Sequence, residues 1–196
     1  TLKDSSGTGI VTGGKCTDSE GGAGIAIDED SLCTIESGVI AGNTSVSYGG
    51  GIKVSGTLTI SGGSISSNIA YDYGGAIYCD KDGKININDV DILSNTSGHD
   101  GAGIYIILNN NDSSINDCLI LNNKSAGKGG NENTSYGGGL YIGAKDEAYI
   151  LTLNDTTISG NSSADRGGAV YISEGTLKMT DCAVEENTSE DGGGIY

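Results

Sequence analysis

The chain of 196 residues contains no proline, tryptophan or phenylalanine, and only ten lysines and arginines. Without Phe and Trp, a thick core built around large aromatic side chains is excluded. The ten basic residues stand against 26 acidic ones, which gives a net charge of −16. Nucleic acids and anionic membranes select positively charged surfaces, so this balance argues against both as partners. No apolar run is long enough to cross a bilayer.

Glycine is abundant, with 35 residues, and much of it belongs to an internal repeat. Three small residues followed by an aliphatic anchor recur seven times, at 25- to 36-residue intervals, with anchors at Ile25, Ile52, Ile77, Ile104, Leu140, Val170 and Ile195. A second signature, aliphatic-x-x-Asn, recurs six times and ends at Asn43, Asn68, Asn95, Asn123, Asn161 and Asn187. The segment Ile10-Val-Thr-Gly13 resembles this second signature without its Asn. Such periodicity is typical of solenoid architectures.

Between the two signatures lies a third short segment with alternating aliphatic residues, such as Leu58/Ile60 and Ile85/Ile87. Each repeat of about 25 residues therefore contains three short strands separated by Gly, Ser, Asn and Asp turns. No segment has a helical period. Stacking one coil per repeat buries the aliphatic positions between parallel strands. The sequence predicts an all-β, right-handed parallel β-helix of about seven coils with three short strands per coil.

The paired signatures resemble the repeats of the chlamydial polymorphic outer-membrane proteins and the wider group of adhesin-like right-handed β-helix proteins. Those repeats carry Gly-Gly-Ala-Ile and Phe-x-x-Asn, and the Phe position is Ile or Val here, as in Ile65 to Asn68. The resemblance runs from Ile10 to Tyr196. It implies a surface-exposed or secreted region involved in adhesion, without catalytic residues or a cofactor. Because the sequence stops within a repeat, we expect residues 1–196 to form a single β-helix segment of a longer protein.

The asparagine column is the most regular polar feature of the repeat. We expect each Asn to turn inward at a bend and to bond its counterpart one coil away, as in other stacked strands. Five of these residues also begin Asn-x-Ser/Thr sequons, which require an exposed Asn for glycosylation. Glycans are therefore expected, if anywhere, at the turn residues Asn111 and Asn133.

Five cysteines, an odd number, leave at least one thiol unpaired. The repeat places Cys33 and Cys79 at buried aliphatic positions. Cys118 and Cys182 share a turn column two coil steps apart, roughly 9–10 Å, which is too far for a disulfide. No Cys/His spacing indicates zinc. We expect structural thiols, as in a reducing or anaerobic habitat, and no bound metal.

Tyrosine follows the anchor by one residue at Tyr78, Tyr105, Tyr141, Tyr171 and Tyr196. Alternation places this column on the outer face of the coil, with a weaker column, Tyr48, Tyr73 and Tyr136, interrupted by Asp100. The column has two interpretations: aromatic packing between coils, or a platform on which sugar rings stack. Carboxylates also cluster in the turns. Oxygen-rich turns can bind Ca²⁺, but no calcium-binding motif occurs, so we interpret them as solvated surface charge.

The repeat is interrupted between Asn123 and Leu140, and the turns at 108–114 and 143–149 are lengthened. Insertions in solenoids map to loops that often carry binding residues, although neutral drift produces them too. The residues that we single out there are Lys128, Asn131, Glu132, Tyr136 and Lys145.

Three functional hypotheses follow from these patterns. The first is a non-catalytic structural and adhesive segment at the cell surface or outside the cell, binding host or environmental glycans, surface proteins or further coils of the same protein. The second is a carbohydrate-active β-helix enzyme. Asp89 and Asp91 could point outward together for that chemistry, but they lack an evident basic partner. The third is a subunit of an extracellular filament.

Overall fold

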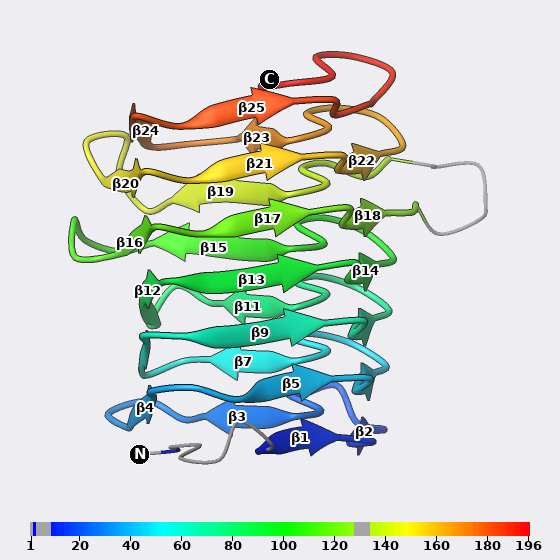
Figure 1. Cartoon of the computed structure of the whole chain (residues 1–196), viewed down its shortest axis with the longest axis vertical. Coiled ribbons are helices and arrows are strands. Elements are labelled where there is room, and N and C mark those ends of the chain that lie inside the picture. Colours follow the sequence, from blue (N-terminus) through cyan, green and yellow to red (C-terminus); the bar gives the residue numbers. More distant parts are fainter. Residues whose placement is uncertain (1, 3–8, 128–133) are drawn as a thin grey trace.

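The computed structural model describes residues 2, 9–127 and 134–196, and these residues form strands and turns only. The strands stack into a parallel β-solenoid of about six turns, which confirms the predicted fold class (Figure 1). In this view the front strands run to the right and the rear strands to the left as the chain climbs, so the coil is right-handed. Among the described residues no helix could span a membrane.

Each complete coil crosses four sheets, each named here by its first strand. The β1 sheet contains β1 (Ile10–Thr12), β5 (Val39–Ala41), β9 (Gly63–Ser66), β13 (Val90–Leu93), β17 (Leu119–Leu121), β21 (Thr157–Ser159) and β25 (Ala183–Glu185). The β2 sheet contains β2 (Lys15–Cys16), β6 (Thr44–Ser45), β10 (Ile69–Ala70), β14 (Thr96–Ser97), β18 (Lys124–Ser125) and β22 (Ser162–Ser163).

The β3 sheet contains β3 (Ile25–Ile27), β7 (Ile52–Val54), β11 (Ile77–Cys79), β15 (Ile104–Leu108), β19 (Leu140–Ala144) and β23 (Val170–Ile172). The β4 sheet contains β4 (Leu32–Ile35), β8 (Thr57–Ile60), β12 (Lys84–Asn88), β16 (Ser114–Asn116), β20 (Ile150–Asn154) and β24 (Thr176–Thr180).

The β2 sheet is the part of the coil that the sequence did not predict. We expected three strands per coil, and the structure adds a fourth, two-residue strand directly after Gly14 and after each ladder Asn from Asn43 to Asn161. These strands are mostly Ser and Thr and are too short to show an alternating pattern. The register also corrects the alignment of the first coil: Val11, not Ile10, pairs with Ile40, so Gly14 stands at the Asn position.

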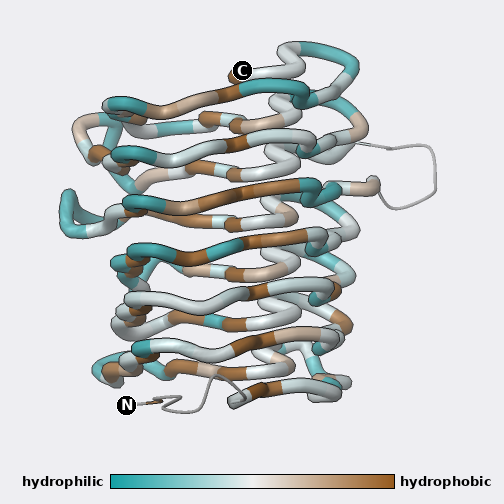
Figure 2. Tube along the Cα trace, viewed as in Figure 1, coloured by the Kyte–Doolittle hydropathy of each residue, from teal (hydrophilic) through white to brown (hydrophobic). Residues whose placement is uncertain are grey.

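Every strand pairs in parallel with its counterpart one coil away, so identical repeat positions lie side by side. The anchors Ile52, Ile77 and Ile104 pair in register, and each is fully buried. Hydrophobic residues recur at the same place in successive coils (Figure 2). The core is therefore a set of aliphatic columns parallel to the long axis, which explains how a chain without Phe or Trp buries enough apolar area.

The cysteines fit this interior as free thiols. Cys79 and Cys118 are buried, and the other three are half-buried. Burial raises the pKa of the Cys118 thiol to about 11 and raises the pKa of Cys79 as well. Thr156 lies in the coil between Cys118 and Cys182 and its Oγ1 accepts a bond from the Cys118 amide at 3.4 Å. No two of these thiols are joined in the structure.

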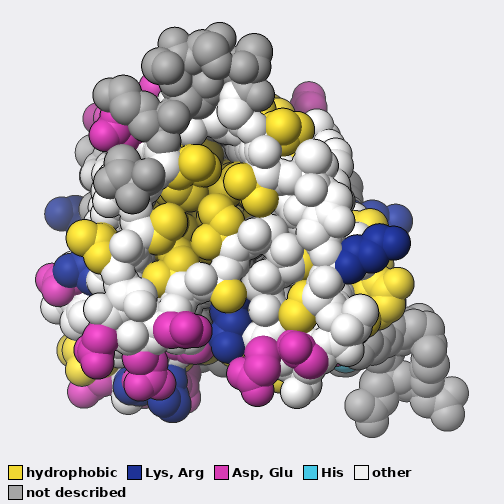
Figure 3. Space-filling view, turned by 90° about the horizontal axis from the view of Figure 1, so that it is seen from below, with side chains coloured by type: hydrophobic (Ala, Val, Ile, Leu, Met, Phe, Trp, Pro, Cys, Tyr) yellow, Lys and Arg dark blue, Asp and Glu magenta, His cyan; other side chains and the backbone are white. Residues whose placement is uncertain are grey.

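The open end of the solenoid exposes part of its interior. Figure 3 shows hydrophobic side chains at the centre of the end nearest β1, with acidic side chains around the rim. Ile10 and Leu32, on strands at this end, are 57% and 69% exposed.

Glycine is required at one corner of every coil. The first Gly of each small-residue run has a left-handed backbone, with φ between +58° and +79° at Gly22, Gly49, Gly74, Gly101, Gly137, Gly167 and Gly192. A Cβ at Gly74 would also lie 2.5 Å from the Ile77 carbonyl oxygen. Only Gly meets both conditions, which accounts for the constant first position of the motif.

We expect Gly74→Ala to lower the free energy of unfolding by about 3 kcal/mol or more, since left-handed strain and a backbone clash add. Gly42→Ala is the matched control: φ is +66°, but the nearest atom to an added Cβ is 3.4 Å away. The control should cost about 1 kcal/mol. Urea unfolding followed by circular dichroism measures both. Equal losses would show that the close contact at Gly74 is easily relieved.

Candidate functional site

A column of tyrosines covers the outer face of the β3 sheet. Each follows a buried anchor by one residue, so alternation along the strand turns its side chain outward. Parallel register then aligns Tyr78, Tyr105, Tyr141 and Tyr171 in four successive coils. Lys53 occupies the same position below Tyr78. The column is a direct product of the repeat.

The rings of this column stack on one another. Tyr105 and Tyr141 have ring centroids 4.6 Å apart and planes inclined by 6°. The pairs Tyr78–Tyr105, Tyr141–Tyr171 and Tyr171–Tyr196 have centroid distances of 5.2, 5.4 and 5.5 Å. Their planes are inclined by 15°, 20° and 8°. Such offset stacking is worth about 1 kcal/mol per pair beyond area burial.

A second column, from the residue before each Gly-rich run, stacks diagonally onto the first. Tyr48 lies 4.7 Å from Tyr78, Tyr73 lies 5.0 Å from Tyr105, and Tyr136 lies 4.6 Å from Tyr171. Each of these tyrosines therefore contacts the first-column ring of the following coil. We call the resulting set the tyrosine ladder: Tyr48, Tyr73, Tyr78, Tyr105, Tyr136, Tyr141, Tyr171 and Tyr196.

Arg166 takes the place of a tyrosine in the second column, a role that sequence reasoning missed. Its guanidinium carbon lies 5.0 Å from the ring centroid of Tyr196 and 6.0 Å from that of Tyr136. Asp165 and Asp191 lie 3.6 and 3.8 Å from its Nε. The sequence did contain a signal for this position, because Arg166 directly precedes Gly167 just as Tyr136 directly precedes Gly137.

The environment of the ladder is partly desolvated. Burial raises the pKa of Tyr78 to about 12 and raises the pKa of Tyr105 further. The internal rings have neighbours on both faces, so a ligand at this surface meets ring edges rather than open ring faces. This geometry fits aromatic packing between coils better than direct stacking of sugars on the faces.

Asp100 interrupts the second column. Its Oδ1 accepts a bond from the Tyr136 amide at 2.9 Å, which ties one coil to the next across the longest insertion. Burial raises the pKa of this carboxyl to about 6, against a smaller opposing effect of that bond. The His99 ring contacts Tyr73 with centroids 5.5 Å apart and planes inclined by 32°, so it continues the column at the interruption.

We expect Asp100→Asn to stabilise the protein at pH 7.5 by on the order of 2 kcal/mol. The folded pKa, about 6, lies above the ordinary 3.8. Wild-type stability therefore falls as pH rises through that window, because the folded state must lose a proton that it holds more tightly. Near pH 4 the variant and the wild type should converge. Thermal unfolding across this range tests the expectation, with the exposed Asp146→Asn as control. A destabilised variant at pH 7.5 would contradict it.

The lengthened turns lie on two different edges of the solenoid. The turns from β15 to β16 and from β19 to β20 lie on the left edge in Figure 1, whereas β18 lies on the right. Asn111 Oδ1 accepts from the Ile150 amide at 2.7 Å, which joins the two left turns. Lys145 lies there, 3.4 Å from Asp82. Tyr136 instead belongs to the tyrosine ladder, so the structure does not bring Tyr136 and Lys145 together.

Four residues singled out from the sequence, Lys128, Asn131, Glu132 and Asn133, lie outside the described residues. Asn111 is exposed, and its Oδ1 is engaged by the Ile150 amide.

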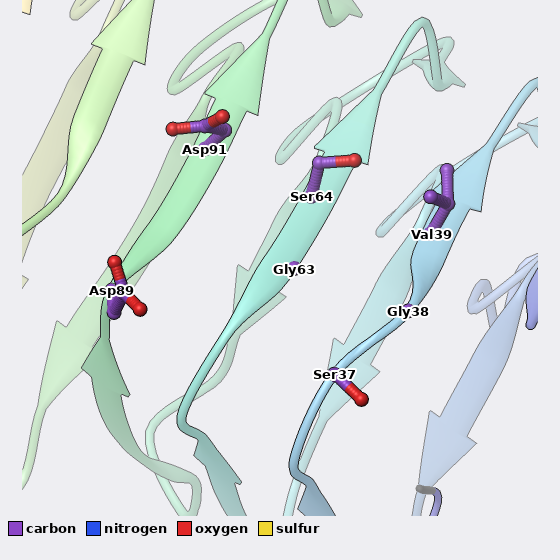
Figure 4. Close-up of a pocket in the computed structure, with 7 residues that line it drawn as sticks. All are labelled: Ser37, Gly38, Val39, Gly63, Ser64, Asp89 and Asp91. Atoms are coloured by element: carbon purple, nitrogen blue, oxygen red, sulfur yellow. The ribbon is translucent and has the colours of Figure 1, made fainter. Parts of the chain in front are cut away.

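Asp89 and Asp91 line an open groove of about 450 Å³ on the β1 sheet (Figure 4). Val90, between the two aspartates, and Ile92, which follows Asp91, are both buried. The two carboxylates therefore face outward. Ser37, Gly38, Val39, Gly63 and Ser64 line the rest of the groove. The lining contains no basic residue. Within the described part of the chain, no group of three or more His, Cys, Asp or Glu is placed to hold a metal ion.

The asparagines form a continuous ladder inside the solenoid. Asn95 Nδ2 donates to Asn123 Oδ1 and to the Ile65 carbonyl, both at 3.0 Å. Its Oδ1 accepts from the amide and Nδ2 of Asn68, at 2.9 and 3.0 Å. Both donors and both acceptor sites of the side chain are thereby occupied. The same pattern joins Asn43, Asn68, Asn95, Asn123, Asn161 and Asn187.

Comparison with known proteins gives one family. The model described as the Chlamydia polymorphic membrane protein repeat matches residues 61–80 and 155–173. The two segments span β9 to β11 and β21 to β23, and each contains one aliphatic-x-x-Asn signature and one Gly-Gly-Ala-aliphatic signature. Comparison with curated proteins and with solved structures gave no match. The chain therefore carries repeats of this type, which confirms the resemblance drawn from the sequence.

Proposed function

Because the chain carries polymorphic membrane protein repeats, we propose that it is a non-catalytic structural and adhesive segment of a cell-surface or secreted protein. It binds glycans or proteins through its outward strand faces and its loops. The observation that carries this proposal is the tyrosine ladder. Eight tyrosines line one face of the solenoid, and each ring contacts at least one other ring of the set.

The binding strength in this mechanism comes from weak contacts that are repeated from coil to coil. Each coil offers the partner a similar outward side chain, and successive coils repeat it at the strand spacing of about 4.8 Å. Contacts that are individually weak then act together, because once one is made the others become intramolecular. The ring edges of Tyr78, Tyr105, Tyr141 and Tyr171 supply these contacts, with Tyr136 beside them and Lys145, Lys128, Asn131 and Glu132 in the loops.

The experiment measures retention of the whole chain on a glycan array and on immobilised surface proteins. The variant Tyr78→Phe/Tyr105→Phe/Tyr141→Phe/Tyr171→Phe keeps the rings and removes four hydroxyl groups. We expect retention to fall while the circular dichroism spectrum stays unchanged. A matched control, Tyr71→Phe, changes an exposed tyrosine outside the ladder. Retention that is the same in all three proteins would reject the tyrosine face as the binding surface.

The groove beside Asp89 and Asp91 supports the second candidate, a carbohydrate-active enzyme. Two carboxylates on one face could divide the roles of acid and base on a glycosidic bond. A depolymerisation assay with the wild type and Asp89→Asn/Asp91→Asn decides between the candidates. Release of sugar by the wild type alone, without retention on the array, would favour the enzyme and overturn the adhesive proposal.

A further inference from the structure

The tyrosine ladder brings oxidisable phenols of adjacent coils into contact. We propose that it is a site of oxidative cross-linking, at which a haem peroxidase with hydrogen peroxide couples tyrosines of neighbouring coils into dityrosine. This modification is independent of whether the face binds a glycan or a protein. It follows from ring geometry and from the choice of oxidisable residues in the chain.

Proximity is the first argument. Dityrosine forms when two phenoxyl radicals meet, so the yield depends on how close two tyrosines are held. In the ladder the contacts range from 4.6 Å for Tyr105–Tyr141 to 5.8 Å for Tyr48–Tyr73, and most pairs are nearly parallel. Neighbouring ring carbons therefore face each other before any oxidant arrives. The paired strands hold the two rings in contact, and the side chains must tilt from stacked to edge-on for the ring carbons ortho to the hydroxyl groups to bond.

The connections between rings form the second argument. Tyr141 is the single link between the group Tyr48, Tyr73, Tyr78 and Tyr105 and the group Tyr136, Tyr171 and Tyr196. Asp100 breaks the parallel route through the second column. A radical formed on any ring therefore has at least one phenol in contact, and the two halves communicate only through Tyr141.

Few other side chains compete for the oxidant. The chain contains no tryptophan and one methionine. Cys79 and Cys118 are buried, so the competing thiols are the half-buried Cys16, Cys33 and Cys182. Tyr71, which is 52% exposed, is the most accessible tyrosine, but no ring contact joins it to another aromatic side chain within the described residues. If accessibility alone decided the products, coupling would join Tyr71 residues of different molecules. If ring contact decides them, coupling joins ladder tyrosines within one molecule.

The chemistry balances with peroxide as the oxidant. Two phenols each lose one electron to the peroxidase and one proton to water. The two radicals form one carbon–carbon bond between ring positions ortho to the hydroxyl groups, and the displaced ring hydrogens pass to the phenolic oxygens. Peroxide takes up the two electrons and two protons and becomes two molecules of water. The protein loses two hydrogen atoms for each link.

A link of this kind would run along the long axis of the solenoid. Tyr105 and Tyr141 belong to β15 and β19, whose strands pair directly. The bond would join coils that backbone hydrogen bonds already hold together, and would restrain them from separating. Its effect is to fasten successive coils covalently on the outer face, where solvent reaches the sheet.

The test exposes the whole chain, at micromolar concentration, to a haem peroxidase and hydrogen peroxide. Dityrosine fluorescence reports the yield, and mass spectrometry of a protease digest maps the links. We expect intramolecular products between ladder neighbours to exceed intermolecular ones by about 100-fold or more, since held partners have an effective concentration of millimolar or above. Dominant Tyr71 products, no dityrosine, or the same map in urea-unfolded protein would overturn the proposal.

Tyr141→Phe gives the sharper test, because the ring and its packing remain while the phenol is lost. Links from Tyr141 to Tyr105 and Tyr171 should disappear, and links such as Tyr48–Tyr78 and Tyr171–Tyr196 should persist. Tyr71→Phe should leave the map unchanged. Circular dichroism verifies that both variants fold as the wild type does. A map in Tyr141→Phe that loses every link equally would contradict coupling by local contact.

Discussion

Asn95→Ala is expected to lower the free energy of unfolding by about 4 kcal/mol or more. The substitution removes four hydrogen bonds made by a side chain with no exposed surface. It leaves the Asn68 amide and the Ile65 carbonyl buried without these partners. Each such group costs roughly 1–3 kcal/mol, because the small cavity does not restore its contact with water. Urea unfolding followed by circular dichroism measures the loss.

Ser97→Ala is the control for this prediction. Ser97 lies two residues after Asn95, points to the same interior and is equally buried. Its Oγ donates only to the His99 carbonyl, at 3.1 Å, and that carbonyl also accepts from Ser125. Ala70 occupies the equivalent position one coil earlier. The control should therefore cost about 1 kcal/mol or less. Equal losses in the two variants would show that the ladder stabilises no more than any inward polar residue.

Secretion of this chain through a eukaryotic pathway is expected to yield misfolded, retained protein. There the glycan is attached to the nascent chain, before a fold can hide its sequons. Asn43, Asn95, Asn123 and Asn161 begin sequons, and all four are fully buried in the structure. A glycan cannot be accommodated in the interior, so each attachment would exclude that coil from the solenoid. Gel mobility and secreted yield measure the outcome.

Ser→Ala substitutions separate glycosylation from folding in this experiment. Changing Ser45, Ser97, Ser125, Ser163 and Ser189 removes the five ladder sequons and keeps every ladder asparagine. Secretion should recover in this variant, as it should in wild type treated with an inhibitor of N-glycosylation. The exposed Asn111 remains available as an acceptor. Secreted, folded wild type with glycans on Asn95 or Asn123 would contradict the prediction.

The fold was predictable because each repeat carries two independent sequence signatures. A small-residue run before each anchor and an Asn three residues after each aliphatic residue fix the register of neighbouring coils. The two-residue strands of the β2 sheet escaped prediction because residues such as Thr44 and Ser45 carry no hydrophobic alternation. The alignment of the first coil failed for a related reason: Gly14 replaces the Asn that marks the register elsewhere.

The candidate site was only partly predictable. The alternation of residues along the strand predicted that Tyr78 and Tyr105 lie on the outer face, but it does not predict toward which neighbouring coil each side chain points. The diagonal contacts, such as Tyr48 with Tyr78, depend on that direction. Arg166 and Asp100 occupy tyrosine positions with charged groups, and sequence comparison of the repeats treats them as interruptions. Their roles follow from contacts with the adjacent coil: Arg166 lies over the Tyr196 ring, and Asp100 accepts a bond from the Tyr136 backbone amide.

The asparagine ladder also has a direction. The backbone amide and Nδ2 of Asn68 both donate to Oδ1 of Asn95, and those of Asn95 donate to Oδ1 of Asn123. The Asn Oδ1 of each coil thus accepts the two hydrogen bonds that the Asn of the preceding coil donates. During growth from the N-terminal side, only the newest coil has donors awaiting a partner. Growth in the opposite sense would instead leave only the newest coil's acceptor awaiting its donors, so the ladder gives the two ends of a stack of coils opposite hydrogen-bonding character.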